Sequence, residues 1–207
     1  MKQLEEIVTI QKFHETGFKE KGSQFTGQAF PVNSEQEISD ILTDVKKKFY
    51  DATHHCYAYK LLDGQFKYSD DGEPSGTAGI RLLNAIDHFD LLNVLVIVIR
   101  YFGGTKLGVG PLGKAYYSSA ESVLNEAKRI TKTAYQQVQI TADFSHTSLL
   151  HKSFSDFEMV VQNTEYLENI NFTCLIKPKL LQNYSDYITD KSSGSIIISA
   201  GDEISYF

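Results

Sequence analysis

The chain has 207 residues, of which 42% are hydrophobic and 12% aromatic, so it has enough apolar material for a folded core. Its formal net charge of −6 argues against generic nucleic-acid binding by the whole surface. No apolar run approaches the roughly 20 residues that a membrane-spanning helix needs, and the N-terminus lacks the apolar core of a signal peptide. We therefore expect a cytoplasmic protein that does not enter a membrane.

Cysteine usage agrees with that compartment. Cys56 and Cys174 are the only cysteines, and they lie far apart in the sequence. Such a pair in a cytosolic chain is more often reduced than bridged. No CxxC or HExxH spacing occurs, so nothing favours a structural zinc site, and we expect neither a metal nor a cofactor.

The first half of the chain alternates strand and helix patterns. Strands are expected near residues 5–13 and 24–32. A capping box at Ser34–Glu37 then begins a helix whose apolar residues recur every three or four positions. The next expected elements are a strand, a hairpin strand, a short helix, a buried strand and a long helix, at residues 53–62, 65–68, 76–87, 91–99 and about 111–129.

The charge balance changes near residues 130–134. From Ala134 to the end there are four basic against nine acidic residues, a net of −5, whereas the preceding residues have a net of −1. Strands are then expected near residues 135–144, 158–163, 171–177 and 195–200, with helices beginning at Ser145 and Pro178. This βαββαβ order is that of a ferredoxin-like α+β sandwich. We expect two α+β domains, residues 1–131 and 132–207.

Residues 69–115 hold eight of the fourteen glycines and two of the four prolines. Glycine is costly to order, so this clustering indicates a backbone that turns tightly or lies close to another group. An acidic turn (residues 70–74) and a basic glycine loop (residues 100–114) both lie in this segment. Any function that the sequence reveals is expected here.

The glycine loop comes close to two nucleotide-binding motifs without satisfying either. Residues 108–115 match GxGxxG and also GxxxxGK, but Ala115 stands where a P-loop hydroxyl would hold magnesium. Pro111 has no N–H for a phosphate, and eight residues separate Ile99 from Gly108, where a dinucleotide site needs the glycines directly after the strand. Nucleotide binding is therefore disfavoured.

What remains is a glycine loop before a helix N-terminus, inside an interval without acids between Asp90 and Glu121. The cations of this interval are Arg100, Lys106 and Lys114. Free amides and the helix dipole would suit an anion there. The alternative is that the glycines only turn a strand back over the sheet. The glycines in question are Gly103, Gly104, Gly108 and Gly110.

Two other clusters have both a chemical and a structural interpretation. The acidic turn lacks the DxDxDG spacing of a calcium loop, so a solvated turn or an ion pair with Arg81 or Arg100 is favoured. In His54-His55-Cys56, strand alternation places His54 and Cys56 on one face. Imidazole could activate the thiol, but such a pair more often packs than reacts. Tyr101 and Phe102, like the tyrosines of residues 57–68, could stack on nucleic-acid bases or simply pack.

Four motifs, in this order and spacing, resemble the IMPACT family, bacterial YigZ branch. They are KGSQF at residues 21–25, DATHHCYAY at 51–59, DDGEPSGTAG at 70–79 and RYFGGTKLG at 100–108. The resemblance implies an N-terminal domain like the second domain of ribosomal protein S five and a ferredoxin-like C-terminal domain. Together they would be similar to the fourth and fifth domains of translation elongation factor G. Where the family commonly has a glycine pair before the last helix, this chain has Gly110-Pro111.

The family's eukaryotic members are translational regulators that compete for an activator of a starvation-responsive kinase. They use a different N-terminal partner-binding domain that is not found in this sequence, so that mechanism does not carry over. What the resemblance implies is a role with RNA, the ribosome or a translation-associated protein.

We therefore expect a non-enzymatic binding protein linked to translation. Its binding residues would be Arg100, Lys106 and Lys114 with Gly103, Gly104 and Gly108. The surrounding motif surface would comprise Lys21, Ser23, His54, Asp70, Asp71, Glu73, Ser75, Thr77 and Tyr101.

Two alternatives stay open. One is a small-molecule or phosphate-ligand enzyme with its pocket between residues 70–77 and 100–108, where Glu73 or Asp71 is the base and Arg100 clamps an anion. The other is a protein-interaction module that uses the acidic C-terminal domain.

Overall fold

The computed structural model describes residues 4–207, which divide into two compact units. Residues 8–131 form the N-terminal unit, and residues 132–207 form the C-terminal unit together with residues 4–7. Residues 4–7 join the C-terminal unit because the Ala134 N–H donates to the Glu5 carbonyl at 2.8 Å. Among the described helices, none is both long and apolar enough to cross a membrane.

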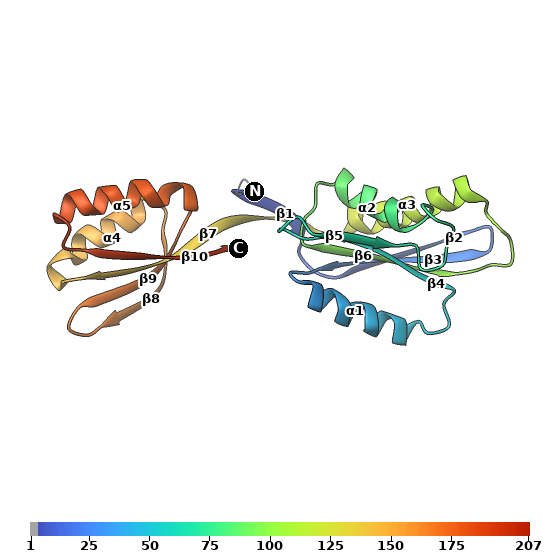
Figure 1. The fold of residues 1–207 in the computed structure, drawn as a ribbon, viewed down its shortest axis with the longest axis horizontal. Coiled ribbons are helices and arrows are strands. Elements are labelled where there is room, and N and C mark those ends of the chain that lie inside the picture. The colour runs from blue at the N-terminus through green and yellow to red at the C-terminus, as the bar shows by residue number, and fades with distance from the viewer. Residues whose placement is uncertain (1–3) are drawn as a thin grey trace. The chain divides into compact units, whose positions relative to one another are not determined.

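The N-terminal unit is a five-stranded antiparallel sheet with helices on both faces (Figure 1). Helix α1 covers one face and helices α2 and α3 the other. In sheet order the strands are β2 (His14–Glu20), β3 (Ser23–Pro31), β6 (Val94–Tyr101), β4 (His54–Lys60) and β5 (Phe66–Ser69). The helices are α1 (Glu35–Lys48), α2 (Gly79–His88) and α3 (Val109–Glu126).

The central strand β6 decides which residues reach which face. Its even-numbered valines, from Val94 to Val98, pack with α2 and α3, and the odd-numbered residues from Leu95 to Ile99 pack with α1. Strand alternation places Arg100 on the α2–α3 face and Tyr101 on the α1 face. Two covered faces explain why seven consecutive residues of this strand are buried.

The C-terminal unit has the expected order of strand, helix, two strands, helix and strand. Its elements are β7 (Arg129–Ala142), a 3-10 turn (Phe144–His146), α4 (Thr147–Asp156), β8 (Val160–Tyr166), β9 (Ile170–Ile176), α5 (Pro178–Ser192) and β10 (Ile197–Tyr206). The antiparallel sheet runs β10-β7-β9-β8, and β1 (Glu6–Ile10) also pairs with β7. Two antiparallel sheets with helices confirm the expected α+β class.

Strand β2 was not expected from the sequence. None of its residues is buried, and both of its faces carry polar side chains, so it has no apolar alternation to detect. Helix α2 also begins at Gly79, three residues after the expected start, because residues 75–77 form part of a turn held by Asp70.

Gly27 in β3 sets how closely α3 approaches the sheet. A Cβ at this position would lie 2.8 Å from the Ser119 carbonyl oxygen. We expect Gly27→Ala to lower the free energy of unfolding by about 1–3 kcal/mol, as overpacking does. Gly110→Ala is the matched control, because no atom lies within 4 Å of its Cβ position and alanine favours the helix. Urea unfolding measures both, and equal stabilities of Gly27→Ala and wild type would contradict this packing.

Candidate functional site

A buried ion pair lies at the centre of the motif residues. Arg100 Nη1 is 2.5 Å from Glu73 Oε1, and the Tyr116 hydroxyl donates to the same oxygen at 2.7 Å. Arg100 is 5% exposed and Glu73 8%. The acidic turn and the start of the glycine loop therefore meet in space, and the positive charge of Arg100 is already neutralised.

Asp70 fixes the turn that carries Glu73. Its carboxylate accepts the backbone N–H groups of Gly76, Ala78 and Gly79 at 2.8–2.9 Å. A carboxylate at a helix N-terminus satisfies orphan amides and suits the helix dipole, which explains how α2 begins without a side-chain cap at Ala78. The Glu73 N–H also donates to the Asp70 carbonyl at 2.9 Å, so the position of Glu73 follows from that of Asp70.

His54 is held against the same pair. Its Nδ1 lies 2.8 Å from the Asp71 carbonyl oxygen, which can only accept, so Nδ1 carries a proton. The other ring nitrogen, Nε2, then lies 3.7 Å from Glu73 Oε1. The Asp71 carboxylate accepts the His55 N–H at 2.7 Å, which ties the turn to strand β4.

Ser23 joins the first motif to the last. Its hydroxyl oxygen lies 3.3 Å from Arg100 Nη2 and accepts the Gly103 N–H at 3.2 Å. A Cβ on Gly103 would lie 1.9 Å from the Gly22 carbonyl carbon, so only glycine fits between these two backbones. Gly103 thus serves a close backbone contact, whereas the Cβ position of Gly104 faces open space.

A cavity of about 340 Å³ opens where the acidic turn and the glycine loop meet. Its polar lining is His54, Glu73, Arg100 and Lys106, and its apolar lining is Pro74, Phe102, Leu107, Val109 and Leu112, with Gly108 between them. It lies within the N-terminal unit and has the size of a small-molecule pocket.

A second cavity of about 350 Å³ lies on the other side of Val109, which lines both. It is lined by Arg81, Val109, Gly110, Gly113, Lys114 and Tyr117. Arg81, Lys106 and Lys114 are exposed, and no carboxylate of residues 4–207 lies within 4 Å of their charged groups. We call these three residues the cationic rim.

Arg81 was not expected to belong to a binding surface. It reaches the rim because α2 packs beside α3, where a Cβ on Gly113 would lie 3.3 Å from Arg81 Nε. The sequence contained only an indirect signal, a lone arginine in a short amphipathic helix next to the motif segment.

The remaining motif residues divide between this site and other positions. Lys21 and Ser75 are exposed in turns, and Thr77 is buried with its hydroxyl donating to the Pro74 carbonyl at 2.6 Å. Gly104 is exposed at a φ of +85°. Tyr101 lies on the α1 face, where its hydroxyl donates to Asp51 at 2.8 Å, so the sheet separates it from the cavity.

Cys56 is a packing residue. It is fully buried, its thiol lies 3.1 Å from the Asp70 carbonyl oxygen, and burial raises its pKa to about 12. A protonated, enclosed thiol is a poor nucleophile, so His54 and Cys56 do not form a catalytic pair.

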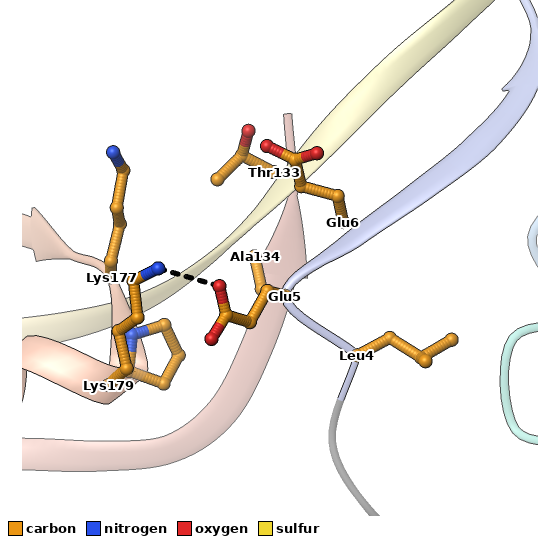
Figure 2. Close-up of a pocket in the computed structure, with 8 residues that line it drawn as sticks. Leu4, Glu5, Glu6, Thr133, Ala134, Lys177 and Lys179 are labelled. Carbon is orange, nitrogen blue, oxygen red and sulfur yellow. Dashed lines mark hydrogen bonds and ion pairs between the residues drawn. The ribbon is translucent and has the colours of Figure 1, made fainter.

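The C-terminal unit has a pocket of about 250 Å³ at the start of α5 (Figure 2). Its two lysines are already paired, Lys179 with Glu5 and Lys177 with Glu158, each at 2.6 Å. Figure 2 shows the first of these pairs across the pocket. With its cations engaged and the surrounding unit acidic, this pocket is a weaker candidate than the cavities beside α3.

Comparison with known proteins places these motifs in one family. The Impact N-terminal domain model matches residues 21–124, which include the ion pair, the cavity and the cationic rim. The chain is 29% identical to IMPACT family member YvyE of Bacillus subtilis, over 98% of this chain and 94% of that protein. It is 25% identical to IMPACT family member YigZ of Escherichia coli, over 88% of this chain and 92% of that protein.

A solved crystal structure of a hypothetical protein has the same fold. It aligns with 97% of this chain and 100% of its own, with a TM-score of 0.69 and 23% identity. The chain belongs to the IMPACT family. Within that family it is similar to the bacterial YvyE and YigZ proteins, as the four motifs indicated.

Both thiols should resist modification in the folded protein. Burial raises the pKa values of Cys56 and Cys174 to about 12, so neither ionises at pH 8. We expect no reaction with a disulfide reagent at pH 8 until urea unfolds the chain, when both should react. In the unfolded chain the thiols lose their protons near pH 9, whereas in the folded chain they keep them up to about pH 12. The free energy of unfolding should therefore fall as the pH rises above 9. Fast labelling of native Cys56 would contradict its placement.

The ion pair predicts an asymmetry between single and double substitutions. Glu73→Leu leaves the Arg100 guanidinium buried without its carboxylate, which should cost about 3–5 kcal/mol of unfolding free energy. Combining Glu73→Leu with Arg100→Met removes both charges, so the double variant should be more stable than Glu73→Leu alone. Urea unfolding of the two variants measures the difference, and additive losses would show that the charges do not interact.

Proposed function

We propose that this protein is a cytoplasmic, non-enzymatic component of translation that binds RNA through its N-terminal unit. The observation that carries the proposal is the cationic rim: Arg81, Lys106 and Lys114 are exposed and unpaired within the described residues, around the N-terminus of α3. Lysine and arginine at such positions bind phosphates, and the free amides of a helix start add to the attraction.

The rest of the surface makes binding local. The whole chain has a net charge of −6, so a nucleic acid would be repelled from most of the protein and attracted at the rim. Three cations make a small footprint, which suits moderate affinity and a salt slope of about −0.7 for each phosphate contact with a single strand.

The translation assignment rests on the fold names that the resemblance implies. The β10-β7-β9-β8 order with two helices supports a ferredoxin-like C-terminal unit, and the motifs support an N-terminal unit like the second domain of ribosomal protein S five. Fold analogy alone does not give function, so the rim and not the fold name is the feature to test.

The buried groups support binding over catalysis. The enzyme alternative needs Glu73 or Asp71 as a base, and both carboxylates already have partners: Glu73 accepts from Arg100 and Tyr116, and Asp71 accepts the His55 N–H and lies 3.5 Å from Lys46 Nζ. The cavity itself favours the alternative of a small-molecule ligand, since it places His54 and Arg100 inside apolar walls. A saturable thermal shift with a small phosphate compound and none with RNA would favour that alternative.

The rim predicts the salt dependence of RNA binding. Replacing Arg81, Lys106 and Lys114 together by alanine should weaken binding of a single-stranded oligoribonucleotide and flatten the slope of log K against log salt by about one unit for each lost phosphate contact. Fluorescence anisotropy across a salt series measures both quantities.

The matched control replaces Lys47, Lys48 and Lys67 by alanine. The net charge changes equally, but two of these lysines lie on α1, which covers the opposite face of the sheet from α3. For this control variant, the slope of log K against log salt should equal that of wild type. If the rim variant keeps the wild-type slope, or if wild type binds no RNA, the proposed function is wrong.

A further inference from the structure

We propose that the cavity beside α3 receives one unstacked base of a bound RNA strand. This inference rests on the proposed function and specifies it: the rim contacts the phosphates, and the cavity takes a base from the same strand. It therefore assigns a ligand to His54, Glu73, Arg100 and Phe102, which line the cavity without belonging to the rim.

The charge of the cavity argues for a base over a phosphate. Its only buried cation, Arg100, is neutralised by Glu73 at 2.5 Å. A phosphate placed there would meet the Glu73 carboxylate, whereas at the rim it meets cations alone. A neutral, polar and aromatic ligand suits the cavity, and in RNA that ligand is a base.

The polar groups of the cavity can satisfy a base edge. The Nε–H of Arg100, a residue that lines the cavity, is buried and has no hydrogen-bond acceptor among the described residues, so it can donate to an acceptor on a bound ligand. The Glu73 carboxylate beside it offers acceptor capacity. All three of its contacts with Arg100, Tyr116 and His54 fall on Oε1. Adjacent donors and acceptors are what a base edge presents, and arginine and acidic side chains are common partners for it.

The walls supply the stacking and the exclusion of water that such a site needs. Phe102 is 46% exposed and its ring lies 5.5 Å from the Arg100 guanidinium carbon, so it stands at the opening. Leu107 and Leu112 are buried in the wall. Aromatic and apolar side chains are the usual platforms for unstacked bases in single-stranded RNA.

The rim lies at the right place for the flanking phosphates. Lys106 lines the same cavity, and the second cavity with Arg81 and Lys114 adjoins it at Val109. An RNA strand that passes along the start of α3 would thus meet cations on both sides of Val109, and the cavity would be within reach of one of its bases.

The test uses single-stranded oligoribonucleotides of ten residues, the same oligomers with one internal base removed, and the full chain. Phe102→Ala should weaken binding of the intact oligomers by about 5- to 150-fold, the range for loss of one base–aromatic stack, with an unchanged salt slope. Phe102→Leu keeps apolar contact and should lose less. Thermal unfolding of both variants establishes that they are folded.

The abasic oligomers separate this inference from the proposed function. Removing the base that enters the cavity should weaken binding by wild type more than it weakens binding by Phe102→Ala, because the variant has already lost the stacking contact. Suppose that every abasic oligomer binds wild type as tightly as the intact oligomer does, and that the slope of log K against log salt still depends on the rim residues. The base inference is then overturned, and RNA binding stands. If no oligomer binds, both fall. A mononucleotide that binds as tightly as the decamer would also overturn the inference, because a free nucleotide would then be the ligand.

Discussion

The ion pair between Arg100 and Glu73 is the interaction on which the rest of the N-terminal unit depends. Removing two charges from water costs several kcal/mol for each ion, so a buried pair persists only where further hydrogen bonds support it. Here Tyr116 donates to Glu73, and the Ser23 hydroxyl lies beside the guanidinium. Asp70 holds the turn that carries Glu73. Each of the four motifs therefore contributes a polar residue at this pair: Ser23, His54, Glu73 and Arg100.

The same pair divides the surface beside α3 into two chemical environments. Inside the cavity the charges cancel, which leaves a polar floor under apolar walls. Outside it, Arg81, Lys106 and Lys114 have no carboxylate partner within the described residues and keep their positive charge. A ligand with an anionic backbone and neutral aromatic groups fits both environments at once. A simple anion fits only the rim, and an apolar molecule fits only the walls.

Much of this arrangement could be predicted from the sequence, because its signals are local. Strand alternation put His54 and Cys56 on one face, and glycine clustering marked the segments that make close contacts. The burial of Arg100 could not be predicted, since an arginine at a strand end next to glycines is usually exposed and several acids could have paired with it. Arg81 was missed as a rim residue because its place depends on α2 packing against α3, which is a tertiary fact. Strand β2 was missed because its partner β3, and not its own apolar pattern, makes it a strand.

Two glycines of residues 100–114 serve packing, unlike the glycines of a phosphate loop. In a phosphate loop, glycine frees backbone amides to face the ligand. Here the Gly103 N–H is already bonded to Ser23, and Gly103 lies against the Gly22 backbone, so its lack of a side chain serves packing. Gly113 likewise leaves space for Arg81. Because Gly103 and Gly113 admit neighbouring groups, neither of them contributes to a phosphate cradle. The cavity and the side chains of the cationic rim are therefore the features of this surface on which the proposed binding mainly depends.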